Sequence, residues 1–296
     1  HHWPSRCKRR TAGVRTIERS KGGNGRMNAS EARGAGPQLK NATGFGQTVR
    51  NSLTMAYRGL LKIRHTPEQW FDITLQPILF TLMFTYILGG AISGDVIHYL
   101  PVIVPGMVVQ TVITASIVTG VQLREDMEKG VFDRFKSLPI ARIAPLAGAL
   151  MADTVRYAVA TVLTFTIGYL IGYRPEGGLA HVAVAGTIVI ACAWSVSWIF
   201  AFFGVIARSA SGVQGISMMV LLPLTFASNA FVPVHTMPIW LQKFVHLNPI
   251  SHLVTAVRDL ANAGTFSWDL AISLTGAAVI VAVFAPLTVH AYMRRT

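Results

Sequence analysis

Long stretches without a single Asp, Glu, Lys or Arg dominate the pattern of this sequence. Five of them cover residues 73–94, 96–123, 177–207, 209–242 and 270–293. Each has the roughly 20 apolar residues with which a helix crosses about 30 Å of hydrocarbon. A sixth run, 157–173, reaches this length when residues 143–152 join it across Asp153 and Arg156. The pattern predicts six transmembrane helices.

The predicted fold is therefore an all-α polytopic membrane protein. A soluble protein with buried helices would show apolar runs of only about 10–14 residues, and a membrane β-barrel would alternate apolar and polar positions. Asp153 and Arg156 are three residues apart, so they share a helix face and can pair. A surface-level ion pair is the favoured interpretation, and a substrate or coupling pair is the alternative. The predicted spans are about 73–92, 100–123, 143–173, 181–206, 213–233 and 270–292.

Two further segments predict helices that do not cross the membrane. Residues 47–64 carry an apolar stripe with Arg58 and Lys62 opposite it, which predicts an amphipathic helix on the cytoplasmic membrane face. The connection from Pro233 to Trp268 contains an uncharged run of only 14 residues, 244–257. This run predicts a pair of short extracellular re-entrant or interfacial helices.

The distribution of positive charge predicts the orientation. Only 13% of the residues are charged, against about a quarter in soluble domains. Residues 27–72 hold six Lys or Arg and residues 124–142 hold five, whereas the turn at Asp95 holds none. Arg294 and Arg295 follow the last apolar run. Because positive loops are retained in the cytoplasm, we expect both termini there and a multi-pass position in the plasma membrane.

Much of the net charge of +13 lies in the first 26 residues, which hold eight Lys or Arg and one acid. The concentration of charge in this segment gives no reason to expect a nucleic-acid partner. We interpret residues 1–44 as a basic disordered leader and residues 45–296 as the transmembrane domain. No Met precedes Met27, so residues 1–26 are interpreted as translated upstream sequence, with a basic arm on anionic lipid as the alternative.

The segment 124–142, REDMEKGVFDRFKSLPIAR, contains five bases and four acids. One interpretation is a solvated loop, and the other is a docking element whose alternating charges contact a partner protein. The segment resembles the corresponding loop of the type-2 ABC exporter permeases, a family that includes daunorubicin-resistance-like drug and lipid exporters. A second segment, 221–260, resembles the fifth helix and extracellular elements of that family. The residues that carry the first likeness are Glu128, Lys129, Gly130, Val131, Phe132, Asp133, Arg134, Phe135, Pro139 and Arg142.

The resemblance implies the membrane-spanning subunit of an ATP-driven exporter that moves a hydrophobic drug, antibiotic or lipid. Its implied partners are a separate ATP-binding subunit, a second copy of the chain or a sister permease, and membrane lipid. The implied ATPase-coupling residues are Glu125, Glu128, Lys129, Gly130, Phe132, Asp133, Arg134, Pro139 and Arg142. In the family the second and fifth helices line the substrate path, which carries over to Gln110, Thr114, Phe226, Ser228 and Asn229.

The motifs of other functional classes are missing from the sequence. There is no GxxxxGK[ST] phosphate loop, since Phe135 stands where the second Gly would follow Gly130. We therefore expect ATP and magnesium in the partner subunit, and no cofactor or metal in this chain. No HExxH or GxSxG motif predicts an enzyme. The alternative is an ion-coupled secondary transporter or channel, which would need ionisable residues at mid-bilayer or symmetric broken helices.

Overall fold

The computed structural model describes residues 67–130 and 144–295, and every regular element in these two ranges is a helix. The all-α prediction is confirmed there. The basic leader, the amphipathic helix predicted at 47–64 and most of the predicted docking element lie outside the described residues. The helices are α2 (Pro67–Ser93), α3 (Val96–Ala115), α4 (Ile117–Glu128), α6 (Ala144–Ile171), α7 (Gly178–Ile206), α8 (Ala210–Phe226), the 3₁₀ helix η2 (Val234–Thr236), α9 (Ile239–Leu247), α10 (Pro249–Ala263) and α11 (Trp268–Arg295).

Four helices of the described part have the length and apolar character to cross a membrane. They are Val96–Glu128, which combines α3 and α4, then Leu146–Ile171, Gly178–Ile206 and Trp268–Arg294. The shorter apolar helices Thr74–Gly90 and Ala210–Phe226 correspond to the first and fifth predicted spans. Four of the six predicted spans are therefore long enough, and a count of six stays a prediction.

The third predicted span is one continuous helix. Residues 143–152 and 157–173 join as α6, which runs from Ala144 to Ile171 without a break at Asp153 or Arg156. The fifth predicted span is shorter than we expected, because α8 ends at Phe226 instead of residue 233. The Asn248 side chain explains this end: its Nδ2 donates to the carbonyl oxygens of Leu224 at 2.6 Å and Ala227 at 3.1 Å. Carbonyls that a further turn would have used are thereby satisfied.

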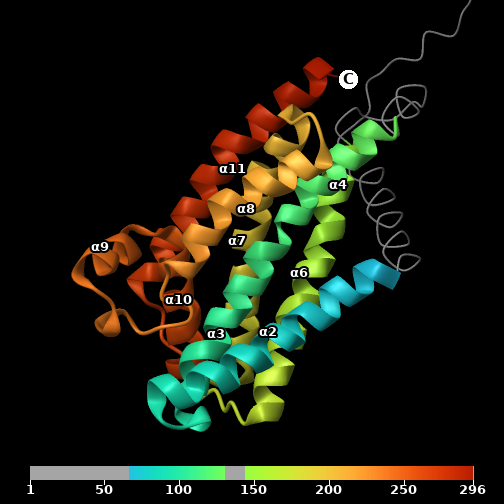
Figure 1. Cartoon of the computed structure of the whole chain (residues 1–296). Coiled ribbons are helices and arrows are strands. Elements are labelled where there is room, and N and C mark those ends of the chain that lie inside the picture. The colour runs from blue at the N-terminus through green and yellow to red at the C-terminus, as the bar shows by residue number, and fades with distance from the viewer. Residues whose placement is uncertain (1–66, 131–143, 296) are drawn as a thin grey trace, which may run out of the picture. The chain divides into compact units, whose positions relative to one another are not determined.

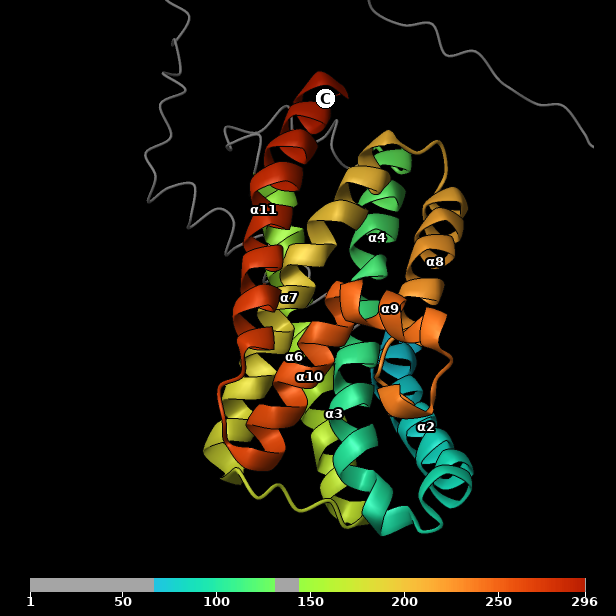
Figure 2. The same cartoon turned by 90° about the vertical axis from the view of Figure 1, so that its left-hand side faces the viewer.

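Helices α3 and α4 form the axis of the bundle. Figures 1 and 2 show α4 continuing α3 in nearly the same direction. At the joint, both the backbone N–H and the hydroxyl of Ser116 donate to Ile113 O, at 3.1 and 2.5 Å. The α3–α4 helix packs against α2, α6, α7, α8 and α10, and most side chains of α3 are buried. The hydrophobic core is therefore built around this helix.

Glycines let α4 approach α7 closely. A Cβ atom added to Gly120 would lie 2.2 Å from Phe200 O, and one added to Gly204 would lie 2.4 Å from Gly120 O. Between helices surrounded by hydrocarbon, the hydrophobic effect supplies little attraction, so close van der Waals packing at small residues contributes more. The α4–α7 contact accordingly depends on these two glycines.

The connections between the helices gather at two opposite ends of the bundle. The end of α4, the start of α8 and the end of α11 lie at one end, which is the upper one in Figures 1 and 2. The turns from α2 to α3 and from α6 to α7 lie at the other. Beside the half of α3 nearer these turns lies α10, the longer of the two short helices in the connection before α11. This arrangement is the one expected of helices that cross alternately.

Adding a methyl group at the α4–α7 contact should destabilise the bundle. We expect Gly120→Ala to lower the free energy of unfolding by about 1–3 kcal/mol, the usual effect of overpacking. Thermal unfolding of the purified protein in detergent measures the change. The matched control is Gly276→Ala in α11, where no atom lies within 4 Å of the added Cβ. Equal melting temperatures for the two variants would contradict the assignment of close packing.

Candidate functional site

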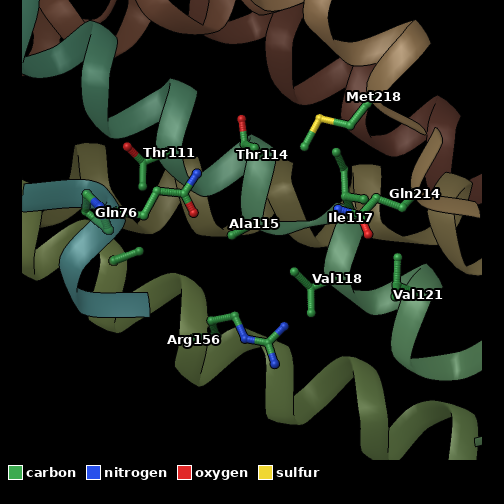
Figure 3. A pocket seen from close by; sticks show the side chains of 12 residues that line it. Gln76, Thr111, Thr114, Ala115, Ile117, Val118, Val121, Arg156, Gln214 and Met218 are labelled. Carbon is green, nitrogen blue, oxygen red and sulfur yellow. The ribbon is translucent and has the colours of Figure 1, made fainter. Parts of the chain in front are cut away.

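Two adjoining cavities lie between α2, α3, α4, α6 and α8. The larger has a volume of about 460 Å³ and the smaller about 240 Å³. Gln76, Thr111, Thr114 and Met218 line both, so the two form one continuous hollow. Its combined volume is in the range of sites that bind small organic molecules. Figure 3 shows the larger cavity with its lining side chains.

Three of the five residues in the predicted substrate path line this hollow. Thr114 lines both cavities, and Gln110 and Phe226 line the smaller one. The Gln110 Oε1 atom is buried and has no hydrogen-bond partner. The structure thus brings together side chains from the second and fifth predicted spans, on α3 and α8.

The other two residues of the predicted path are not among the residues that line either cavity. Ser228 is buried in the turn after α8, where its hydroxyl donates to Thr225 O at 2.6 Å. Asn229 Nδ2 donates to Thr255 Oγ1 at 2.8 Å and so joins this turn to α10. Both residues have structural partners in the turn between α8 and η2.

Side chains that the predicted path did not include complete the larger cavity. Gln76 enters it from α2, Arg156 from α6 and Gln214 from α8. Arg156 carries a sequence signal, since it is an ionisable residue within an apolar helix. The two glutamines carry none, because an amide near a span end is common on helices that face water or protein.

A polar network lies behind the larger cavity. Arg156 Nη1 lies 3.0 Å from Asp153 Oδ1, with side-chain exposures of only 4% and 3%. The Thr119 hydroxyl donates to Asp153 Oδ2 at 2.6 Å and lies 3.0 Å from the Tyr157 hydroxyl. The ion pair predicted from the spacing is therefore confirmed, but it is buried in the bundle instead of lying at its surface.

Opposite charges also pair at the end of α4, where the predicted coupling segment begins. Arg124 Nε donates to Glu128 Oε1 at 3.1 Å, and Lys129 Nζ donates to Glu125 Oε2 at 3.0 Å. Residues 124–128 are therefore helical, not a loop. Gly130 follows with φ of 64°, a conformation that glycine adopts without strain. The predicted coupling residues outside the described part are Phe132, Asp133, Arg134, Pro139 and Arg142.

This charged end is fixed to the bundle and exposed at its tip. Arg124 Nη2 donates to Arg208 O at 2.9 Å, which ties α4 to the connection between α7 and α8. The hydrogen bond to Glu125 and the charge of that carboxylate raise the pKa of Lys129 above its ordinary value. Because a raised pKa favours the protonated form, Lys129 keeps its positive charge throughout the physiological pH range. Its exposed ammonium can contact a partner protein.

At the other end of the bundle, α10 is bound to α3 by side chains that reach backbone carbonyls. Arg258 Nη2 donates to Val102 O at 3.0 Å and to Asn229 O at 2.9 Å. Asn262 Nδ2 donates to Pro101 O at 2.8 Å. These bonds hold the short helices α9 and α10 in a defined position although neither is long enough to span a membrane.

No group of three or more His, Cys, Asp or Glu side chains that could hold a metal is found in the described ranges. The histidines examined for this purpose have local partners: His98 Nδ1 lies 3.2 Å from Asp95 Oδ2, and His252 Nδ1 lies 2.5 Å from Asp269 Oδ1. Ser195 and Ser197, the serines tested for a nucleophile motif, hydrogen-bond to carbonyls of their own helix, Ala191 O and Trp194 O. These side chains are packing and helix-end groups.

A bundle of long apolar helices that surrounds a partly polar hollow and ends in a charged helix terminus is typical of a membrane transport protein. Comparison with known proteins defines the family. Residues 50–261 match the family model described as ABC-2 type transporter. The chain belongs to this family, as the segments 124–142 and 221–260 predicted.

Curated relatives are permease proteins of drug-resistance transporters. The daunorubicin resistance ABC transporter permease protein DrrB1 of Streptomyces coeruleorubidus is 44% identical over 247 residues, 83% of this chain and 87% of that protein. The doxorubicin resistance ABC transporter permease protein DrrB of Mycobacterium tuberculosis is 28% identical over 198 residues, 65% of this chain and 68% of that protein. These relatives are transport permeases, and the chain is similar to them over most of its length.

Neutralising one member of the buried ion pair should harm stability more than neutralising both. Asp153→Asn leaves the Arg156 charge without its partner in the bundle, which in buried sites costs about 3–5 kcal/mol. Arg156→Gln should be milder, because a lone Asp153 can take up a proton whereas an arginine stays charged. The double variant should recover most of the loss in thermal unfolding measurements. Additive losses from the two substitutions would refute the coupling of these groups.

Proposed function

We propose that this chain is the membrane-spanning permease subunit of an ATP-driven exporter, working with a separate ATP-binding subunit. The observation that carries the proposal is the position of α4. Its first half lines the larger cavity through Ile117, Val118 and Val121, and its last turn carries Glu125 and Glu128 of the coupling motif. A displacement applied at the charged end is therefore transmitted to the cavity wall along one helix, over about 10 Å.

In this proposal the segment 124–142 docks on the ATP-binding subunit, and nucleotide-driven closure of that subunit moves α4 and the helices packed on it. The pairs Arg124–Glu128 and Lys129–Glu125 hold the last turns of α4 in helical form. The Arg208 contact passes the displacement to α7 and α8 as well. ATP and magnesium are bound by the partner, for which the missing phosphate loop in this chain gives support.

The transported molecule is a hydrophobic drug, antibiotic or lipid. Most side chains around the two cavities are apolar, and the polar ones are neutral apart from Arg156. The names of the relatives connect them with daunorubicin and doxorubicin resistance, which supports an amphipathic drug for this chain. We further propose a functional dimer, with a second copy or a sister permease, in the plasma membrane, with both termini and the α4 end on the cytoplasmic side.

An ion-coupled secondary transporter is the second candidate, and the buried Asp153–Arg156 pair is the observation that favours it. Against it, Asp153 is held by both Arg156 and Thr119, which stabilises one fixed charge state. Transport of a fluorescent substrate into inverted vesicles distinguishes the two. The exporter requires ATP and the partner subunit, whereas an ion-coupled transporter responds to a pH gradient without either.

Reversing the charge at the tip of α4 should uncouple ATP hydrolysis from the permease. We expect Glu128→Lys to reduce permease-stimulated ATPase activity more than about tenfold, because like charges facing each other across an interface cost several kcal/mol. Membrane insertion and the melting temperature should stay near those of the wild type. Glu176→Lys, an exposed acid in the turn between α6 and α7, is the matched control and should leave stimulation unchanged.

A milder substitution separates docking from local structure. Glu128→Gln keeps an oxygen that can accept the hydrogen bond from Arg124 Nε but removes the negative charge. If Glu128 acts through its charge on the partner, this variant loses stimulation too. Wild-type stimulation by Glu128→Gln and Glu128→Lys alike would refute the docking role.

A further inference from the structure

The larger cavity has one charged residue in its wall. Arg156 projects from α6 into the space between α3, α4 and α8, as Figure 3 shows. It lies twelve residues after the start of α6 at Ala144, which places it about 18 Å along this helix. The side chain is only 4% exposed, so its guanidinium is removed from bulk water. A charged group at this depth is expensive unless polar atoms surround it.

The partner of Arg156 leaves part of the guanidinium unused. Arg156 Nη1 lies 3.0 Å from Asp153 Oδ1 without the alignment of a hydrogen bond, and this nitrogen has no other hydrogen-bond partner. The second carboxylate oxygen of Asp153 already accepts from Thr119 at 2.6 Å. A guanidinium carries five N–H donors, more than one carboxylate oxygen can accept. Asp153 is also not among the residues that line the cavity.

The other polar residues in the wall are uncharged. Gln76, Thr111, Thr114 and Gln214 offer amides and hydroxyls, and the remaining lining residues are apolar. In the described part of the wall, then, no carboxylate is available to attract a cationic group of a ligand. The charge of Arg156 and its unused N–H groups instead favour oxygen atoms that accept hydrogen bonds.

We infer that the larger cavity binds an apolar molecule through its hydrogen-bond-accepting oxygens, such as quinone, phenolate or carbonyl oxygens, with Arg156 as the main donor. The inference deepens the proposed export function, since it rests on this chain carrying a hydrophobic substrate. Such oxygens complete the hydrogen bonding of a buried guanidinium, which is costly when left unmet. Flat rings with carbonyl oxygens meet both requirements, because their faces contact the aliphatic wall while their edges reach Arg156. Lipid ester or phosphate oxygens present the same acceptor chemistry.

Two fluorescent ring compounds test the inference on the purified permease in phosphatidylcholine nanodiscs, without any ATPase. 1,4-Dihydroxyanthraquinone carries four oxygens on a three-ring skeleton, and anthracene has the same skeleton without oxygen. We expect Arg156→Lys, which keeps the charge for Asp153 but removes the planar fork of donors, to weaken quinone binding about tenfold or more. Anthracene affinity should change less than about twofold, since ring contacts with the aliphatic wall remain.

Further variants guard against misfolding. Asp153→Asn/Arg156→Gln removes both charges together and should also weaken quinone binding selectively. Arg174→Lys, in the exposed turn after α6, is the control and should bind both compounds as the wild type does. Loss of both compounds in parallel, or unchanged quinone binding by Arg156→Lys, would overturn the assignment of Arg156.

Phosphatidylglycerol nanodiscs separate a transported molecule from a lipid. Unchanged quinone affinity in them supports a small-molecule ligand. Displacement of the quinone from the wild type, but not from Arg156→Lys, would overturn that ligand in favour of a lipid headgroup. Because binding is measured without ATP, failure of the coupling experiments on Glu128 would leave this result intact, and the two proposals can fail separately.

Discussion

The structure depends on one constraint, which is that backbone N–H and C=O groups surrounded by hydrocarbon must find partners within the protein. A helix meets this demand along its length, so the difficulty is confined to ends and breaks. Ser116 bridges the joint between α3 and α4 through Ile113 O. Asn248 satisfies both the end of α8 and the start of α10, since its Nδ2 donates to Leu224 O and its Oδ1 accepts from Ile250 N. One amide thus allows the chain to turn back between these helices.

Close packing follows from the same surroundings. With little hydrophobic attraction between helices in lipid, contact area comes from small residues, and Gly120 and Gly204 bring α4 against α7. On the opposite side of α4, longer and more polar side chains leave the two cavities open. The same helix therefore has a tightly packed side and a side that faces a hollow. This asymmetry lets a movement of its charged end change the hollow while α7 supports it.

The buried ion pair connects stability with the proposed binding. Asp153 and Arg156 are an expensive pair to bury, and hydrophobic replacements of such pairs are often neutral or stabilising. Thr119 and Tyr157 lessen the cost on the carboxylate side, because the Thr119 hydroxyl donates to Asp153 and lies near the Tyr157 hydroxyl. The guanidinium side is left with free donors at a cavity wall. A ligand that accepts hydrogen bonds gives this arrangement a purpose that packing alone does not.

The sequence by itself determined the helical class, the family and the position of the spans, because charges are excluded from hydrocarbon in any fold and the segment 124–142 is a local motif. It also predicted the pairing of Asp153 with Arg156, which follows from helical spacing. Only the tertiary structure decided that α8 ends at Phe226, that Ser228 and Asn229 serve the turn after it, and that Gln76, Arg156 and Gln214 meet at one hollow. These facts depend on contacts between residues far apart in the chain, which no local pattern of apolar and polar positions records.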